Sequence, residues 1–316
     1  MKRLTVIIPI YNAEKKISTC LDSILPQLTE EDELLLINDG SNDNSLMVIT
    51  SYKEKYPYIR IIDKENEGVS KTRNLGIKEA KGTYICFVDN DDYVCPDYFD
   101  TYYKAIKDTK FDMVMGGYQR VSTKGVQFSV KASDSDWYKL MVVAPWAKIY
   151  RRQFLLEHNI EFLDYGIGED NFFNFQVYTK TDKVKIIPYT GYNWWFNDES
   201  ISNTSQRGFK KNVDITFLMN SLYKLTSGKG IYNYYYLRYV VWYLLFSGKS
   251  AKSDDFLKEY QKDFSWLKEH NISQNFLKYQ TKIKGESFLN RVIVGIFVVL
   301  HKLRLVKIFS KLYCKA

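Results

Sequence analysis

The chain has 316 residues, of which 45% are hydrophobic and 26% charged, as in a globular protein with one large or two ordinary domains. Its formal net charge of +8 lies in one segment, since residues 278–316 hold nine basic residues and a single acidic one. A nucleic-acid-binding protein more often spreads basic residues over its folded body, so we expect no nucleic-acid partner. The four cysteines have no regular spacing and the N-terminus lacks a signal-peptide pattern, which predicts a cytoplasmic location.

The first hundred residues alternate between strand-like and helix-like patterns. Apolar, β-branched runs at 4–8, 34–37, 59–62 and 84–88 predict strands, and the segments 14–25, 45–56, 69–80 and 97–106 predict helices. Short apolar strands separated by helices are typical of a parallel sheet that is covered on both faces. The predicted fold class is therefore α/β, with a Rossmann-like, mostly parallel sheet.

The second half of the chain changes character. Strands are predicted at 113–115, 148–150, 184–187 and 189–195, and a helix at 171–178, as a continuation of the same domain. From about residue 208 the pattern becomes helical, with predicted helices at 210–225, 232–246, 254–268 and 287–313. We therefore predict a domain over 1–207 and a C-terminal helical region over 208–316.

Polar residues follow each of the first four predicted strands. They occur in the segments Pro9-Ile10-Tyr11-Asn12, Asn38-Asp39-Gly40-Ser41, Asn66-Glu67-Gly68 and Asp89-Asn90-Asp91-Asp92. Ligands of open parallel sheets bind outside the carboxyl ends of the strands, so this edge is the expected site. The chain contains neither G-x-x-x-x-G-K-[ST] nor G-x-G-x-x-G, which removes the main support for a P-loop or dinucleotide site.

The acidic residues of this edge predict a cation site. Asp89 and Asp91 leave a buried strand together, and two close carboxylates are unfavourable unless a cation or a proton joins them. A divalent ion held by one or two carboxylates and the phosphates of a substrate is a common solution. The alternative is a solvated Asp-rich turn that caps the following helix.

Three further positions have a functional and a structural interpretation each. Asp39 could accept the imide N–H of a pyrimidine, or it belongs to an ordinary Asp-Gly turn. Arg73 suits phosphate groups through its planar fork, or is an exposed helical arginine. Glu169-Asp170 could supply a general base, or could favour the dipole of the helix that follows.

In combination these segments resemble glycosyltransferase family 2, the inverting enzymes with the GT-A fold. The matching segments, in family order over roughly residues 4–202, are "VIIPIYN", "INDGSND", "NEGVSKTRNLG", "FVDNDDY", "KIYRR", "GIGEDNFF" and "DESIS". The resemblance implies a GT-A catalytic domain over 1–207, with a nucleotide-sugar half at 1–95 and an acceptor half at 96–207. It also implies an enzyme of bacterial surface-polysaccharide synthesis.

The resemblance also implies roles for individual residues. Asp170 would be the catalytic base, and Asp91, with Asp89, would hold Mn²⁺ or Mg²⁺. The donor-binding residues would be Pro9, Tyr11, Asp39, Asn66, Arg73, Asp89 and Asn90. Tyr11 and Asp39 would contact uracil and Arg73 the nucleotide and diphosphate. The acceptor side would include Trp146, Lys148, Glu169 and Trp195, although an ordinary buried role is open for the tryptophans.

The implied reaction is a single inverting transfer from a nucleotide-diphosphate sugar, with a UDP-sugar as the expected donor, to a hydroxyl of a glycan or lipid-linked glycan. A hexosyl- or N-acetylhexosaminyltransferase fits, and the Q-x-x-R-W signature of processive synthases is absent. Two alternatives remain: a sugar nucleotidyltransferase, which usually has a Gly-rich basic loop near its N-terminus, and a non-catalytic glycan-binding relative.

The C-terminal segment predicts a membrane contact. Its apolar run at 292–300 is shorter than the roughly 20 residues that span a bilayer. In one helix over 287–313, Arg304, Lys307 and Lys311 would share a face opposite Leu305, Phe309 and Leu312, as in an interfacial helix. We therefore expect a peripheral position on the inner face of the cell membrane. The alternative is a helix packed on the catalytic domain with its basic side in solvent.

Overall fold

The computed structural model describes residues 2–107, 111–196, 208–210, 213–275 and 283–315. Two compact units are present: unit 1 comprises residues 1–133 and 143–196, and unit 2 comprises 134–142 and 197–316. The segment 134–142 thus belongs to the helical unit, although it lies within the sequence predicted for the first domain. The predicted boundary at 207/208 and the motif at 198–202 lie outside the described residues.

Unit 1 is built on one mixed sheet with the strand order β3-β2-β1-β4-β8-β6-β9-β5, and β7 pairs with β6. The strands are β1 (Lys2–Ile10), β2 (Glu33–Asp39), β3 (Ile59–Lys64), β4 (Gly82–Phe87), β5 (Tyr93–Val94), β6 (Met113–Ser122), β7 (Gly125–Val130), β8 (Lys148–Arg151) and β9 (Val184–Trp195). β1 to β4 are mutually parallel, and β8 is antiparallel to its neighbours β4 and β6. The predicted α/β class is confirmed.

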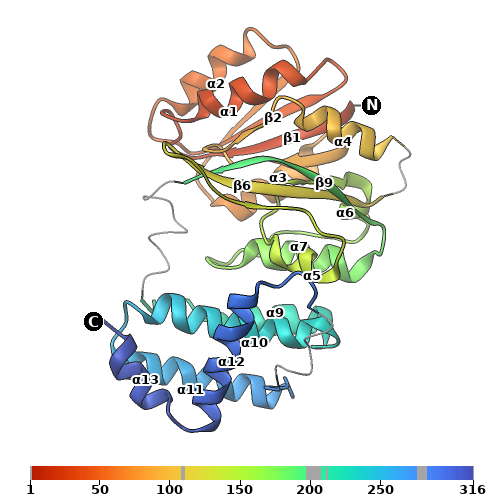
Figure 1. Cartoon of the computed structure of the whole chain (residues 1–316). Coiled ribbons are helices and arrows are strands. Elements are labelled where there is room, and N and C mark those ends of the chain that lie inside the picture. The colour runs from red at the N-terminus through yellow and green to blue at the C-terminus, as the bar shows by residue number, and fades with distance from the viewer. Residues whose placement is uncertain (1, 108–110, 197–207, 211–212, 276–282, 316) are drawn as a thin grey trace. The chain divides into compact units, whose positions relative to one another are not determined.

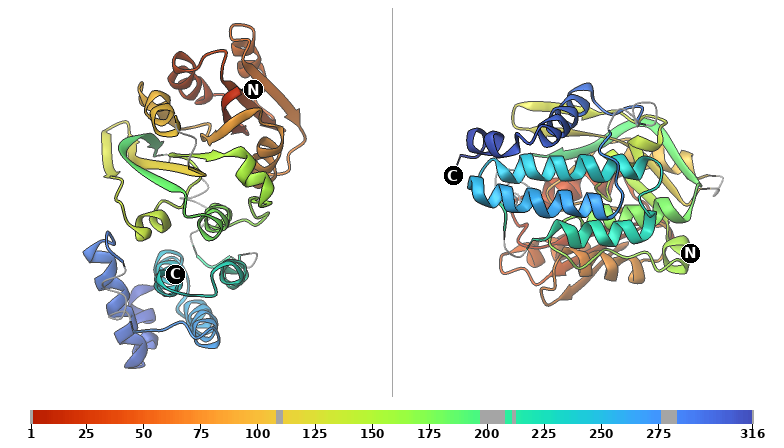
Figure 2. Two further views of the ribbon diagram at one scale, coloured as in Figure 1. Left: turned by 90° about the vertical axis from the view of Figure 1, so that its right-hand side faces the viewer. Right: turned by 90° about the horizontal axis from the view of Figure 1, so that it is seen from below.

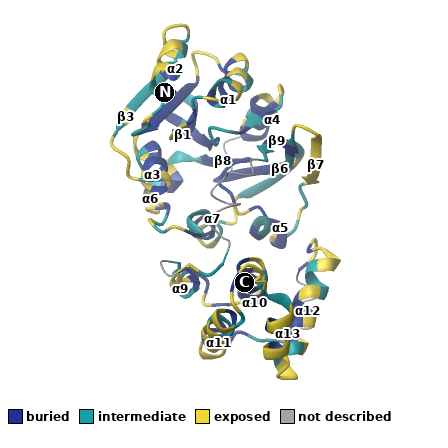
Figure 3. Cartoon of the chain, turned by 90° about the vertical axis from the view of Figure 1, so that its left-hand side faces the viewer, coloured by how far each residue is buried: buried dark blue, intermediate teal, exposed yellow. Residues whose placement is uncertain are grey.

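Helices cover both faces of the parallel part of this sheet, as predicted. The α-helices of unit 1 are α1 (Ile17–Ile24), α2 (Ser45–Lys53), α3 (Val69–Glu79), α4 (Tyr98–Ile106), α6 (Arg152–Glu157) and α7 (Glu169–Lys180). α1 and α2 lie on one face of β1 and β2, and α3 lies on the other (Figures 1 and 3). α3 approaches the sheet closely at Gly76, where an added Cβ would lie 2.6 Å from Cγ2 of Ile7.

The carboxyl ends of the central strands are level with one another. Ile10 of β1 pairs with Asn38 of β2, and Asn38 pairs with Asp63 of β3. This register brings the loops after β1, β2 and β3 to one edge. The strands themselves are held by their continuous apolar sequences, which are buried on both sides.

Unit 2 is helical and is built around α10 (Ile231–Gly248), whose buried residues lie on several sides of the helix. Its other helices are α5 (Asp136–Met141), α9 (Ile215–Thr226), α11 (Ser253–Glu269), α12 (Phe288–Lys302) and α13 (Val306–Tyr313) (Figure 2). The chain has 26 tyrosines. Five of them are buried in α10, namely Tyr234, Tyr235, Tyr236, Tyr239 and Tyr243. These rings form a core and are not available to sugars.

The prediction of one continuous helix over 287–313 is wrong. α12 ends at Lys302, and Arg304 has a φ of +59° before α13 begins at Val306. The turn allows Phe309 to pack on Phe256 and Phe297, at ring distances of 6.0 and 5.9 Å. Phe309 is therefore half-buried against the core of unit 2, and Arg304 lies in the turn and not on a helical face with Lys307.

Candidate active site

The first residues of the predicted donor side lie where β1 and β4 end next to each other. Pro9 is buried near the end of β1, and its carbonyl oxygen accepts a hydrogen bond of 2.9 Å from Nδ2 of Asn90. Tyr11 follows the strand, with 48% of its surface exposed. Asn90 thus ties the two loops together, and the ring of Tyr11 is open to solvent as a base-stacking residue requires.

Asp39 is more constrained than the sequence suggests. Its carboxylate accepts hydrogen bonds of 2.9 Å from the backbone N–H groups of Glu67 and Gly68 and forms an ion pair with Lys64. Burial raises the pKa of Asp39, but the bonds from Lys64 and Glu67 outweigh it, so the pKa is lowered. Asn66 lies in the same turn and donates to the carbonyl oxygen of Asp39 at 2.9 Å. The carboxylate therefore orders the turn that leads into α3.

Arg73 connects two carboxylates that the sequence places 81 residues apart. Its Nη1 donates to Asp170 at 2.9 Å and its Nη2 to Asp89 at 2.7 Å. The guanidinium lies 5.3 Å from the ring centre of Phe162, and only 5% of its side chain is exposed. Burial lowers the pKa of Arg73, but the two carboxylates raise it, so it stays charged. The predicted donor arginine, the predicted base and Asp89 of the predicted metal pair thus form one cluster.

Asp170 lies in the first turn of α7, which begins at Glu169 after Gly168 in a left-handed conformation. Burial raises the pKa of Asp170 to about 8, because the attraction of Arg73 and Lys148 is partly cancelled by Glu169 and Asp89. A carboxylate with such a pKa can take up a proton near neutral pH, as a general base requires. About a quarter of its side chain (24%) remains exposed.

The loop after β4 holds three carboxylates in different environments. Asp91 is 31% exposed and lies 3.9 Å from Nζ of Lys16, and burial together with Asp89 raises its pKa. Asp92 is buried and accepts hydrogen bonds from the Tyr192 hydroxyl at 2.6 Å and the Trp195 backbone N–H at 2.8 Å. Asp92 therefore fixes the loop to β9, while Asp91 remains accessible.

Tyr192 was not predicted as a site residue. Its hydroxyl also accepts a bond of 3.2 Å from the backbone N–H of Asp89, so it links the loop at both ends. Asp92 is the third aspartate of the "DNDD" run, so the sequence could have indicated a role for it. Nothing in the local sequence indicates that Tyr192 of β9 contacts Asp92. Their proximity depends on the pairing of β5 with β9.

Asp89 and Asp91 suit a divalent cation. Among the described residues there is no group of three or more His, Cys, Asp or Glu side chains that could hold a metal by itself. A pair of carboxylates completed by substrate phosphates needs no such group. Burial, and after it the charge of Asp89, raises the pKa of Asp91, and a cation beside the two carboxylates would offset both effects.

The predicted acceptor-side residues divide into buried and partly exposed ones. Trp146 is almost fully buried and stacks on Tyr192, with ring centres 4.5 Å apart and planes at 5°. Lys148 is completely buried, donates to the carbonyl oxygen of Ala144, and has its pKa lowered by burial to about 7 despite the attraction of Asp170. Glu169 and Trp195 are half-buried. Trp146 thus has the packed role that the sequence left open.

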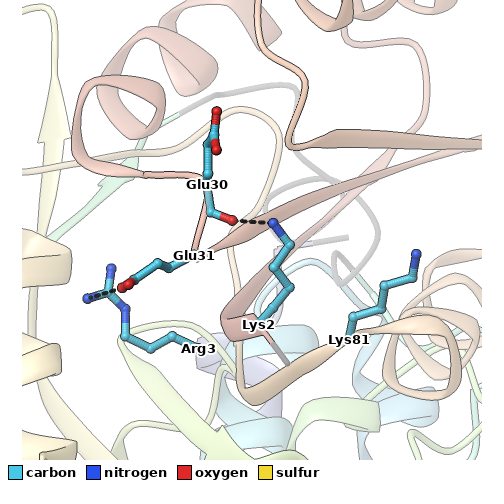
Figure 4. Close-up of a pocket in the computed structure, with 5 residues that line it drawn as sticks. All are labelled: Lys2, Arg3, Glu30, Glu31 and Lys81. Atoms are coloured by element: carbon cyan, nitrogen blue, oxygen red, sulfur yellow. Dashed lines mark hydrogen bonds and ion pairs between the residues drawn. The ribbon is translucent and has the colours of Figure 1, made fainter.

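A pocket elsewhere in unit 1 includes none of these residues. Figure 4 shows its lining by Lys2, Arg3, Glu30, Glu31 and Lys81. They lie at the amino ends of β1, β2 and β4, opposite to the edge where parallel sheets bind ligands. Arg3 also pairs with Glu31 at 3.7 Å, so part of the charge is compensated within the pocket.

Comparison with known proteins identifies a family. Residues 5–204 match the model of "Glycosyl transferase family 2". Glycosyltransferase GlyA of Streptococcus pneumoniae serotype 4 is 29% identical over 73% of this chain and 36% of its own length. The uncharacterized glycosyltransferase YibD of Escherichia coli K12 is 28% identical over 66% of this chain and 65% of its own length.

A third relative is the poly(ribitol-phosphate) beta-glucosyltransferase of Bacillus spizizenii, which is 32% identical over 58% of this chain and 31% of its own length. The chain therefore spans between about a third and two thirds of the length of these three relatives. Among solved structures, residues 1–349 of S. aureus TarS in complex with UDP-GlcNAc align with a TM-score of 0.60 and 18% identity. That alignment covers 98% of this chain and 89% of the other, and it supports the GT-A fold.

Proposed function

This chain belongs to glycosyl transferase family 2, and we propose that it transfers one sugar from a UDP-sugar to a hydroxyl of a glycan or lipid-linked glycan, with inversion at C1. The observation that carries the proposal is the contact of Arg73 with both Asp89 and Asp170. This contact supports the proposal because it joins Asp170, which we assign as the base, to Asp89, which we assign to the donor side. The relatives support a role in surface polysaccharide synthesis, since one is a poly(ribitol-phosphate) beta-glucosyltransferase.

On the donor side, we assign the nucleotide to the level ends of β1, β2 and β3. The exposed ring of Tyr11 stacks on uracil, and Pro9 and Asn90 hold the neighbouring loops together. Asp39 keeps the turn before α3 in place and can still accept from the base, because a carboxylate has about four acceptor positions. TarS, whose structure contains UDP-GlcNAc, supports the choice of a UDP-sugar.

Members of this family generally use a divalent metal ion. We assign Mn²⁺ or Mg²⁺ to Asp91, with Asp89 beside it, since Asp91 is accessible and its pKa is raised by burial and by Asp89. When bound, such an ion supplies charge neutralisation for the departing diphosphate. The carboxylate of Asp92 already accepts hydrogen bonds from Tyr192 and Trp195, so we assign Asp92 as a positioning residue of the same loop.

On the acceptor side, Asp170 is the general base. The acceptor oxygen attacks C1, the bond between C1 and the diphosphate oxygen breaks, and UDP leaves with the bonding electrons. The hydroxyl proton passes to the Asp170 carboxylate. Arg73 orients that carboxylate, and Glu169 and Trp195 contribute to the acceptor side.

We further propose that residues 1–207 form the catalytic domain and that residues 208–316 place it at the inner face of the cell membrane. The acceptor would then be a hydroxyl of a lipid-linked glycan at that surface. The local concentration of the positive charge in 278–316 supports this location.

A donor assay tests the proposed function. The purified chain is incubated with individual UDP-hexoses and UDP-N-acetylhexosamines, with Mn²⁺ or Mg²⁺, and the release of UDP is measured. We expect release from one donor, its loss on chelation of the metal, and strong loss in Asp91→Asn but not in the exposed helical control Asp100→Asn. Release of pyrophosphate from a parallel mixture of UTP and a sugar 1-phosphate, without release of UDP from any UDP-sugar, would indicate a nucleotidyltransferase and contradict the proposal. No release of UDP from any donor would contradict it as well.

A further inference from the structure

Exposed apolar side chains are concentrated at the C-terminal end of unit 2. Of the 18 large hydrophobic residues that are exposed in the described chain, nine lie within 288–312. They are Phe288, Leu289, Ile293, Ile296, Val299, Leu303, Leu305, Ile308 and Leu312. Scattered exposed hydrophobic residues are common, but a contiguous set of this size indicates an interaction surface.

On α12 these residues form a row on the side away from the core. Leu289, Ile293 and Ile296 follow one another at helical spacing, while Val294, Phe297 and Val298 are buried within unit 2. The start of the helix is anchored by the ion pair between Glu286 and Arg238, at 2.6 Å. α12 is therefore fixed to the unit by one face and presents a second apolar face to its surroundings.

α13 has three different faces. Val306 and Ser310 are buried, Ile308 and Leu312 are exposed, and Lys307 lies on a third side. Leu312 is 83% exposed, the largest value among the exposed hydrophobic residues of the described chain. An apolar face beside a basic one is the arrangement of helices that lie in an anionic membrane interface.

A pocket lies at the elbow between α12 and α13. Its lining includes Lys302, Arg304 and Lys307, together with the polar groups of Tyr260, Gln261 and His301, and it contains no acidic residue. In the described part of the chain none of the three cations forms an ion pair. Burial and the charge of Lys302 lower the pKa of His301, which is consistent with an uncompensated positive potential. The elbow is suited to a phosphate group.

We propose that the exposed rows of α12 and α13 lie in the surface of an anionic bilayer and that the elbow pocket holds a lipid phosphate. This inference deepens the proposed membrane location and rests on it. A second copy of the chain is a poorer occupant, because two such surfaces would bring like charges together. Among the described helices none is long and apolar enough to cross a membrane, so the surface is assigned to the interface of the bilayer.

Vesicle binding tests the charge component. The full chain is mixed with vesicles of phosphatidylcholine alone or with phosphatidylglycerol, and bound protein is measured by sedimentation. We expect binding only to the anionic vesicles, with a loss of roughly a hundredfold in the triple variant Lys302→Gln, Arg304→Gln, Lys307→Gln. The control is the triple variant Lys53→Gln, Lys55→Gln, Lys124→Gln, which removes three positive charges from exposed positions of unit 1. It should bind the vesicles as the unmodified chain does.

Apolar substitutions test the other component. Ile296→Gln, Ile308→Gln and Leu312→Gln together should weaken binding by roughly tenfold or more, and the exposed control pair Met47→Gln and Val126→Gln should not. Equal binding to neutral vesicles, or unchanged binding in both sets of variants, would overturn the proposal. So would a chain that is dimeric in sedimentation velocity and becomes monomeric only in the apolar variant.

The donor assay separates this inference from the proposed transfer. Vesicle binding needs no sugar donor, and the elbow variants leave the residues of unit 1 unchanged. UDP release that persists in a variant that no longer binds vesicles supports both proposals. UDP release without any vesicle binding by the unmodified chain would remove the docking surface and leave the transferase assignment in place.

Discussion

Replacement of Arg73 by Met should destabilise unit 1 more than any exposed charge change in the same helix. Met preserves the aliphatic packing near Phe162 and removes both hydrogen bonds to Asp89 and Asp170. Breaking a buried pair by removing one partner costs about 3–5 kcal/mol, and charge-assisted bonds contribute roughly 1.5–3 kcal/mol each. Since the two carboxylates remain 30% and 24% exposed, water can partly replace the guanidinium. We therefore expect Arg73→Met to lower the free energy of unfolding by an amount at the low end of this range, about 3 kcal/mol.

The assay is equilibrium unfolding in urea, with Lys71→Met as the matched control. Lys71 lies in the same helix and also faces two carboxylates, Glu67 at 3.9 Å and Asp164 at 3.6 Å, but half of its side chain is exposed. Its replacement should cost less than about 1 kcal/mol. The double variant Arg73→Met, Asp89→Asn should recover part of the stability, because it removes a carboxylate that has lost its partner.

The loss in free energy of unfolding that Arg73→Met causes should also increase with pH. The pKa of Asp170 is raised to about 8 in the folded chain, so the folded state binds this proton more tightly than the unfolded state, and stability falls as the pH rises from about 4 to 8. Without Arg73 the pKa rises further and the fall continues above pH 8. A loss below about 1 kcal/mol, a loss equal to that of Lys71→Met, or no rescue by Asp89→Asn would refute this account of the cluster.

Three further results are expected. Tyr192→Phe removes the hydrogen bonds of the hydroxyl to Oδ2 of Asp92 and to the Asp89 backbone N–H, and should cost roughly 1–3 kcal/mol in urea unfolding. Tyr52→Phe, whose hydroxyl bonds an exposed Asp22, should be nearly neutral. For transfer, kcat/KM should rise with pH to a plateau above about 8 as Asp170 loses its proton, and a flat profile between pH 6 and 9 would count against the assignment. Because the pKa of Lys148 is lowered to about 7, the unfolded state binds more protons above pH 7, so this group should add roughly 2 kcal/mol of stability between pH 7 and 9. Parallel curves of stability against pH for Lys148→Met and the unmodified chain would contradict this.

The parallel part of the sheet could be predicted because its local sequence agrees with its environment. β1 and β2 each contain a run of apolar residues, at 6–10 and 34–37, that is buried. Gly40, with a φ of +66°, leaves β2 where an added Cβ would lie 2.6 Å from the backbone nitrogen of Asn66. A glycine at such a position can be predicted from the sequence, because the backbone conformation that requires it is set by the turn itself.

The antiparallel half and the anchoring of the site were harder to predict. β5 has only two residues, too few for a pattern, and β7 is a mostly exposed strand of six residues that lacks the continuous apolar run of the central strands. Tyr192 reaches Asp92 across 100 positions of the chain, and its contact depends on which strands pair. Likewise, the local pattern continues α12 into α13, but packing of Phe309 against Phe256 and Phe297 favours the turn at Arg304.

The central claim is that Asp170 is the base of a sugar transfer, and Asp170→Asn tests it most directly. UDP binding is measured by calorimetry and transfer by product formation, in this variant and in the unmodified chain. The account predicts that transfer falls by at least roughly a hundredfold while UDP binds with little change, because general base catalysis contributes about 10²- to 10⁴-fold. Transfer at the unmodified rate by Asp170→Asn would contradict it.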